Sequence, residues 1–247
     1  MINAVLYNVF LCWMVSVAGW MVARTLFRQP QRNLAWQSLA GCWNFAAMLW
    51  FFAGLRNFFY FLYLLTKQVF LLGLDRLMFF ADEICLACQL LAGIIFAAEI
   101  IWQNRRRTWI LAGFTFVSLT AFLLLLFVEG IADTVATTWG TEHELPRNAF
   151  FAFLPGYVLS LLLFGYGILL MAWRRWRQSE SYDRAALAAI IGMLLYALAG
   201  IVDVRGTWSG WQLLLIRLVY PVSALLTLLA ALPQETSIRI VAHGRKS

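Results

Sequence analysis

The chain has little charge for its length of 247 residues. Only 13% of its residues are charged and 63% are hydrophobic, whereas soluble domains are about 25% charged and about 45–50% apolar. A soluble globular fold is excluded, because the surplus apolar surface must face lipid. We therefore expect an all-α integral membrane protein, since apolar helices satisfy their own backbone hydrogen bonds in a bilayer.

Histidine is almost missing, and neither of the two present lies in an apolar segment. They are His143, in a polar loop, and His243, near the C-terminus. Bis-histidine haem ligation, a Ser–His dyad and an intramembrane zinc site all need a histidine within a span. The sequence excludes all three. Lysine is equally scarce, and the last apolar segment has none, which argues against a retinal Schiff base there.

The cysteines are few, and their placement does not match a secreted disulfide framework. Cys12, Cys42, Cys85 and Cys88 all lie within or beside apolar segments. Cys85 and Cys88 form a Cys-x-x-Cys pair of the kind that membrane thiol oxidoreductases use with quinone. No second such pair is present, so we interpret both as small buried residues. A quinone-coupled thiol oxidoreductase stays open as a second alternative.

Seven apolar segments make up almost the whole chain, and most are long enough to cross the roughly 30 Å hydrocarbon core of a bilayer. We expect spans at Ile2–Ala23, Leu34–Gly54, Leu77–Trp102, Thr108–Val128, Ala149–Trp173, Ala185–Val204 and Trp211–Leu232. Together they form one transmembrane domain, residues 1–232. A short cytoplasmic tail, residues 233–247, completes the chain.

Arginines cluster at every second junction between these spans. Clusters lie in 24–32, 105–107 and 174–184, and the tail is basic as well. Loops on the cytoplasmic side of a membrane carry an excess of Lys and Arg. The pattern therefore predicts seven transmembrane helices with the N-terminus outside and the C-terminus inside, in a bacterial cytoplasmic (inner) membrane. Because the basic residues flank spans, we do not expect nucleic acid as a partner.

The segment Arg56–Arg76 is rich in Phe and Tyr but also contains charges. If its part Phe58–Leu74 were an eighth span, every later basic cluster would move to the outside. That span would also bury Lys67, at a cost of roughly 2.5–3.5 kcal/mol. We therefore predict an outer interfacial or re-entrant aromatic segment between the second and third helices.

The third span has a polar face. At 100° per residue, Asp82, Cys85, Gln89 and Glu99 fall within a sector of about 100°. Asp82 and Glu99 are separated by roughly 26 Å of helical rise. This face indicates either a proton or cation path, or a packing seam whose two acids lie at the two membrane surfaces.

Asp203 and Arg217 form a second pair of candidates, across the last helical hairpin. Arg217 lies roughly 9 Å from the outer end of its span, and a charge at that depth needs a partner. We expect Asp203 as that partner, with Asp82 and Glu83 as rivals. Arg217 either pins the helices together or binds an anionic ligand.

The sixth span carries Ala188, Gly192, Tyr196 and Gly200 at four-residue spacing, and three of the four are small. Such a face lets two helices approach closely in lipid, so we expect these residues to make interhelical contacts.

The polar loop Glu129–Asn148 contains Glu142, His143 and Glu144. These three side chains are of types that bind metals. We interpret them as part of a solvated loop and expect no metal site.

The sequence favours three functions, in descending order. The first is a non-enzymatic accessory, structural or signal-relaying subunit that acts through other membrane proteins, with lipids as its only bound small molecules. The second is a small transporter or an ion or proton channel that uses the polar face of the third span and Arg217. The third is the thiol oxidoreductase described above. No catalytic motif supports an enzyme.

Overall fold

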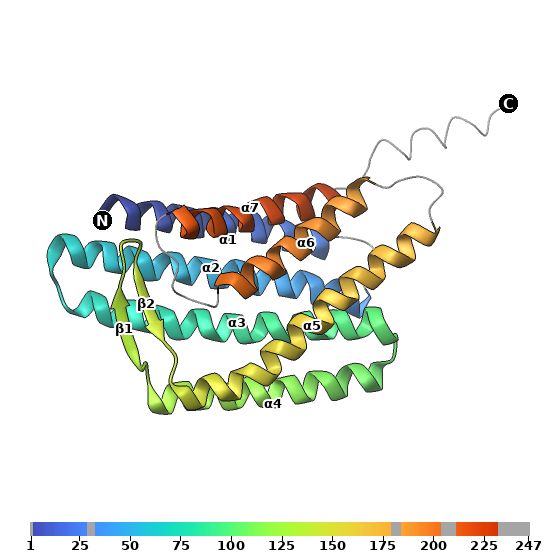
Figure 1. The fold of residues 1–247 in the computed structure, drawn as a ribbon, viewed down its shortest axis with the longest axis horizontal. Coiled ribbons are helices and arrows are strands. Elements are labelled where there is room, and N and C mark those ends of the chain that lie inside the picture. The colour runs from blue at the N-terminus through green and yellow to red at the C-terminus, as the bar shows by residue number, and fades with distance from the viewer. Residues whose placement is uncertain (1, 29–32, 179–183, 204–210, 232–247) are drawn as a thin grey trace.

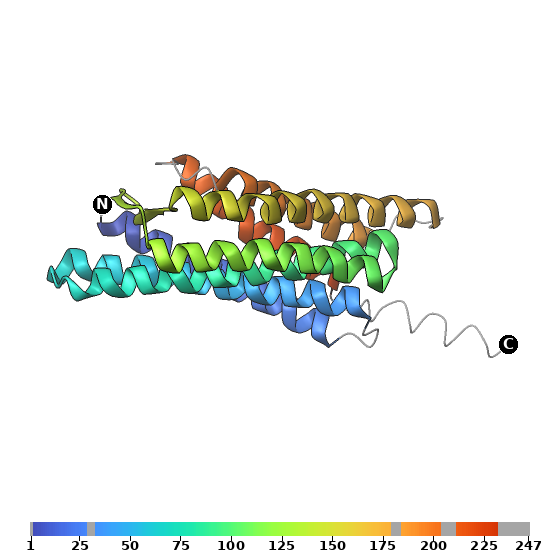
Figure 2. The same cartoon turned by 90° about the horizontal axis from the view of Figure 1, so that it is seen from below.

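The computed structural model describes residues 2–28, 33–178, 184–203 and 211–231. Their helices are α1 (Ile2–Phe27), α2 (Leu34–Thr66), α3 (Phe70–Trp102), α4 (Arg105–Glu129), α5 (Arg147–Gln178), α6 (Arg184–Asp203) and α7 (Trp211–Ala231). Two short strands, β1 (Asp133–Ala136) and β2 (Thr141–Glu144), lie between α4 and α5. The helices run along one long axis (Figures 1 and 2). The expected cytoplasmic tail lies outside the described residues.

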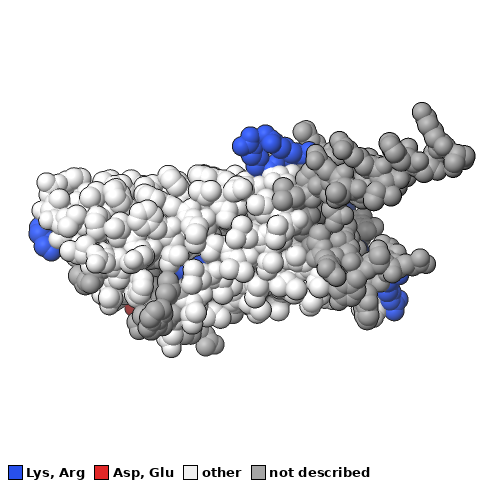
Figure 3. Space-filling view, turned by 90° about the horizontal axis from the view of Figure 1, so that it is seen from above, with Lys and Arg blue, Asp and Glu red and all other residues white. Residues whose placement is uncertain are grey.

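Length and composition make this a helical, multi-pass membrane protein. Five helices, α1 to α5, are long and apolar enough to cross a membrane, and α6 and α7 contain the shorter apolar stretches Leu187–Gly200 and Leu215–Leu229. Large apolar side chains on α4, such as Val117 and Leu124, point outward. Figure 3 shows a long stretch of surface that is almost free of charged atoms. Such a surface is suited to lipid.

The segment Arg56–Arg76, expected as an interfacial or re-entrant segment, is a helical hairpin that continues α2 and α3 and is not a separate span. α2 and α3 each continue for 33 residues and meet in a tight turn. Lys67 makes this turn in the left-handed conformation, with φ 59°, and its N–H donates to the Tyr63 carbonyl. Two of the charges within 56–76, Arg56 and Asp75, lie close to each other across the hairpin.

The α2–α3 hairpin extends beyond its neighbours. At 1.5 Å per residue each arm is about 50 Å long, more than a bilayer core requires. Phe80 of α3 stacks on Phe127 of α4, with ring centroids 5.1 Å apart, and α4 ends two residues later at Glu129. The hairpin tip, residues 58–78, therefore projects past the end of α4, as Figure 1 shows.

The polar loop between α4 and α5 is not simply solvated, and it adds a small β element to an otherwise helical chain. β1 and β2 pair antiparallel, with Asp133 opposite Glu144 and Ala136 opposite Thr141. This β-hairpin lies across α2 and α3 (Figure 1). We call this side of the bundle the β-hairpin end. The opposite side, where Arg105 lies, is the arginine end.

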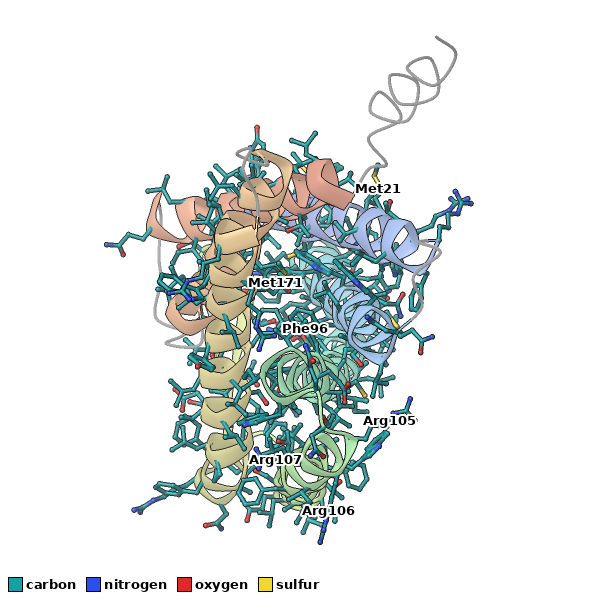
Figure 4. All side chains as sticks on the ribbon, turned by 90° about the vertical axis from the view of Figure 1, so that its right-hand side faces the viewer. Met21, Phe96, Arg105, Arg106, Arg107 and Met171 are labelled. Carbon is teal, nitrogen blue, oxygen red and sulfur yellow. The ribbon has the colours of Figure 1, made fainter. Side chains whose placement is uncertain are left out.

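The bundle is organised around α2 and α3. α2 packs between α1 and α3, α3 also contacts α4 and α5, and α7 packs on α1 and α6. A hydrophobic cluster fills the half nearer the arginine end; its buried members include Val22, Leu39, Trp43, Phe96, Ile168 and Met193. Figure 4, a view along the long axis, shows Phe96 and Met171 pointing into the space enclosed by α2, α3 and α5.

Candidate functional site

A cavity of about 340 Å³ lies inside the bundle, between the β-hairpin end and the hydrophobic cluster. Helices α2, α3, α5, α6 and α7 and strand β2 contribute to its wall. Its charged and titratable wall residues are Arg56, Asp82, Glu142, His143 and Arg217; neutral polar ones include Gln89, Tyr157, Ser160 and Tyr196; and deeper apolar ones include Cys42, Trp43, Gly93, Phe164 and Met193. Cavities of this size accommodate small organic ligands.

Arg56 links three elements at the charged side of this cavity. Its Nη1 donates to Asp82 Oδ2 over 3.0 Å, and its Nη2 donates to the backbone carbonyl of Thr141 over 2.7 Å. Its Nε lies 3.7 Å from Asp75 Oδ1. The planar, multidentate guanidinium suits such a junction better than an ammonium would. Arg56 therefore joins α2 to α3 and anchors the β-hairpin to both.

Asp75 is the second anchor of the β-hairpin. Thr141 Oγ1 lies 3.0 Å from each of its carboxylate oxygens and donates to the carboxylate. His143 Nε2 lies 3.1 Å from Asp75 Oδ2, and the other ring nitrogen lies 2.9 Å from Thr134 Oγ1. The His143 side chain is 0% exposed, so the expectation that it is solvated is wrong.

Burial sets the charge state of His143. Desolvation is the largest influence and lowers its pKa from 6.5, and the nearby Arg56 charge acts in the same direction. The hydrogen bond with Asp75 opposes this shift without cancelling it. His143 is therefore neutral at pH 7, and its ring packs on Phe79 with centroids 4.9 Å apart. Among the described residues no group of His, Cys, Asp and Glu is placed to hold a metal ion.

Arg217 of α7 lies at the same cavity. Its guanidinium is 4.7 Å from the centre of the Trp50 ring, a cation–π distance. Its Nη1 lies 3.7 Å from Cys12 Sγ. Asp203, the expected partner, is the last residue of α6, but its side chain lies outside the described residues. The pairing of these two residues stays a prediction.

The structure divides the polar face of the third span between two places. Asp82 and Gln89 line the cavity, and Cys85 is buried between them along α3. Glu99 lies near the arginine end, where it accepts a hydrogen bond of 2.8 Å from Thr108 Oγ1 at the start of α4. The face therefore combines a cavity wall with a separate contact between α3 and α4.

Tyr196 is the polar centre of the cavity. Its hydroxyl lies 3.2 Å from Trp50 Nε1 and 3.4 Å from Gln89 Nε2, and both nitrogens donate to it. Its ring packs edge-on against Trp43 and Tyr220, at centroid distances of 5.0 and 5.1 Å. One side chain of α6 thus contacts α2, α3 and α7.

The small residues of α6 have different surroundings. A Cβ on Gly192 would lie 2.5 Å from the Ser223 carbonyl oxygen, so α6 and α7 approach closely there. Gly200 lines the cavity, and its carbonyl accepts a hydrogen bond of 3.4 Å from the Tyr157 hydroxyl. Ala188, one turn before Gly192, is partly buried.

Sequence reasoning missed Arg56, Asp75, Thr141 and His143 as members of one cluster. One signal was available: Asp75 and Asp82 are seven residues apart and therefore lie on the same face of a helix. The partners of these two acids come from α2 and β2. No sequence pattern indicates that these elements lie beside α3.

Comparisons of the chain with protein-family models, with curated proteins and with solved structures found no match. The function is therefore argued from the site. The cavity combines charged wall residues with a deeper wall that is neutral and largely apolar.

Proposed function

We propose that this chain is a non-enzymatic, seven-span membrane component that relays the state of its cavity to partner membrane proteins. The cavity is the observation that carries the proposal. Five helices and β2 line it, so an occupant touches elements from both halves of the chain. A ligand that prefers one arrangement of these helices shifts the population toward it, and a partner on the outer surface can respond.

The topology that we propose has the β-hairpin end outside and the arginine end inside. Support comes from the arginines at the start of α4, of which Arg105 and Arg106 point away from the bundle in Figure 4. α6 has 20 residues and α7 has 21, which corresponds to about 30 Å each. These lengths match the bilayer core and support the proposal of seven spans, which we place in a bacterial inner membrane.

The α2–α3 hairpin tip supports the involvement of protein partners. It projects past α4 and exposes Leu65, Val69, Phe70 and Leu77, at 54%, 73%, 62% and 56%. Exposed apolar residues beyond the part of a membrane protein that contacts lipid are suited to a protein partner. In the proposed topology this tip is on the outer side, where it is available to a second membrane protein.

Transport is the second candidate, favoured by the charged residues at the cavity. Asp82 and Arg217 would attract ions or polar solutes from the outside. The cavity, however, ends on Trp43, Phe164 and Met193, which also belong to or pack on the hydrophobic cluster. A transport cycle would have to open this packed layer, whereas a relay needs only small helix shifts.

Recovery of partners from native membranes tests the relay. After gentle extraction, native mass spectrometry should show another membrane protein in fixed stoichiometry with the chain. The variant Phe70→Ser should lose it, because the hairpin tip becomes polar. The matched variant Val117→Ser, at a lipid-facing position of α4 that is 67% exposed, should retain it. A chain that is recovered without protein partners and conducts ions in liposomes is instead a channel.

A further inference from the structure

The hydroxyl of Ser160 is a buried polar group at the cavity. Ser160 of α5 lines the cavity and is 2% exposed. Its hydroxyl has no hydrogen-bond partner among the described residues. A buried hydroxyl without a partner costs about 1–3 kcal/mol. Serines in helices usually satisfy themselves on their own backbone, so this hydroxyl is suited to an occupant of the cavity.

A second hydrogen-bonding group lies at the same depth. α3 and α5 both run from the β-hairpin end toward the arginine end, and Gly93 lies opposite Phe164, because a Cβ there would be 3.6 Å from the ring. Gln89 and Ser160 each precede this contact by four residues, which is one helical turn. The Gln89 amide and the Ser160 hydroxyl are therefore at a similar depth in the cavity wall, and Gln89 Nε2, which donates one hydrogen bond to the Tyr196 hydroxyl, has a second N–H.

The charges at the cavity disfavour an ionic ligand. The two terminal nitrogens of Arg56 are already bonded, to Asp82 and to the Thr141 carbonyl. An anion would be attracted by Arg217, but it would have to compete with Asp82 for Arg56 and would also meet Glu142, another wall residue. A cation would meet Arg56 and Arg217. A neutral molecule avoids both penalties.

The deeper wall of the cavity is apolar and partly aromatic. Trp43 and Phe164 line it together with Met193. Aromatic walls bind planar apolar groups through large contact areas and offset stacking. A volume of about 340 Å³ falls at the lower end of the range for small-molecule sites, so the buried part of the occupant is compact.

We propose that the cavity binds an uncharged, lipid-soluble molecule with a flat ring that carries a carbonyl acceptor, as in a quinone. The carbonyl accepts a hydrogen bond from Ser160 Oγ or Gln89 Nε2, and the ring lies against Trp43 and Phe164. The proposal deepens the relay function by naming the chemistry of its input.

Ligand binding by the purified chain in nanodiscs tests this proposal without any partner. The probe is dimethylnaphthoquinone, whose substituted ring positions prevent addition of the Cys42 thiol. Dimethylnaphthalene has the same shape without carbonyls, and naphthoate is its anionic counterpart. Binding is measured as the amount of each ligand retained by nanodiscs that contain the chain in excess of the amount retained by empty nanodiscs, because the 12 tryptophans of the chain make fluorescence quenching unspecific. The quinone should bind saturably and more tightly than either comparison ligand.

Two pairs of measurements connect the binding to the cavity. Ser160→Ala should weaken the binding of the quinone by about 3- to 10-fold, the equivalent of one hydrogen bond. It should leave the binding of dimethylnaphthalene unchanged. Gly93→Leu should fill the cavity and abolish saturable binding. Gly113→Leu makes the same change at an exposed position of α4 with nothing within 4 Å of the new Cβ, and should bind normally.

Each contrary result overturns the proposal. Tightest binding of naphthoate would indicate an anion site. Equal effects of Ser160→Ala on both neutral ligands would mean that no carbonyl is recognised there. Saturable binding that survives Gly93→Leu would place the ligand elsewhere, and a lack of saturable binding would mean that the cavity does not bind this class. Partner recovery is measured separately, so failure of the relay and failure of ligand binding are distinguishable.

Discussion

Arg56 and Asp82 form an ion pair across the base of the α2–α3 hairpin, with Nη1 and Oδ2 3.0 Å apart. Their side chains are 15% and 8% exposed. The same guanidinium also bonds the Thr141 carbonyl of the β-hairpin. One pair therefore closes the helical hairpin, forms part of the cavity wall and fixes the strand that covers it.

Removing either member of this pair should destabilise the bundle strongly. Arg56→Leu or Asp82→Asn leaves a buried charge without its partner, which typically costs about 3–5 kcal/mol. The double variant should lose less than the sum, because the Arg56–Asp82 pair is then removed as a unit, while Asp75 keeps the hydrogen bond from Thr141. Thermal unfolding in detergent measures all three. Arg76→Leu, an exposed arginine of α3, is the control and should change little. Strictly additive losses would mean that the two residues act independently.

Docking of the β-hairpin should weaken as the pH falls. Burial lowers the pKa of His143 in the folded state below 6.5, so the unfolded state binds a proton more readily. The contribution of neutral His143 to the free energy of unfolding is complete above pH 6.5. It is lost as the pH falls from 6.5 toward the lower pKa that His143 has in the folded state. The melting temperature should therefore decrease between pH 7 and 5, and His143→Gln should flatten that decrease. A gain of stability on acidification would mean that the Asp75 contact holds a charged imidazole.

The two ends of the bundle should be accessible from opposite sides of the membrane. In a background with the four native cysteines changed to serine, Lys67→Cys lies in the turn of the α2–α3 hairpin and Arg106→Cys at the start of α4. An impermeant maleimide should label the first in intact cells and the second only after permeabilisation. The cysteine-free chain controls for background. Labelling of both positions in intact cells would contradict the orientation inferred from the arginines.

Any residue larger than glycine at position 192 should destabilise the packing of α6 against α7. A Cβ there would lie 2.5 Å from the Ser223 carbonyl oxygen and 2.7 Å from Thr227 Oγ1. Gly192→Ala should therefore cost about 1–3 kcal/mol through overpacking between α6 and α7. Gly165→Ala in α5, where nothing lies within 4 Å, should be neutral or stabilise by about 0.5–1 kcal/mol from helix propensity. Equal stabilities in detergent would show that the two helices separate easily.

Composition and local pattern determined the class of this protein. Lipid tolerates only backbones that satisfy their own hydrogen bonds, so long apolar segments had to become helices whatever their neighbours. Asn33 and Asn104 likewise cap α2 and α4 by accepting backbone hydrogen bonds from Trp36 and from Arg106. These interactions are local, and the sequence contains all that they need.

Tertiary structure alone decided the site and the length of the second and third helices. In the sequence, Arg56 suggests the end of a span. In the structure it pairs with Asp82, 26 residues away, and the helix continues past it. Thr141 reaches Asp75 across 66 residues, which turns an apparently solvated loop into a docked β-hairpin. From the sequence alone, a charge within an apolar segment suggests the end of a span or an unfavourable contact with lipid. Whether it is paired depends on which helices pack together, and the hydrophobic pattern does not encode that choice, because in lipid the apolar faces of all the helices are alike.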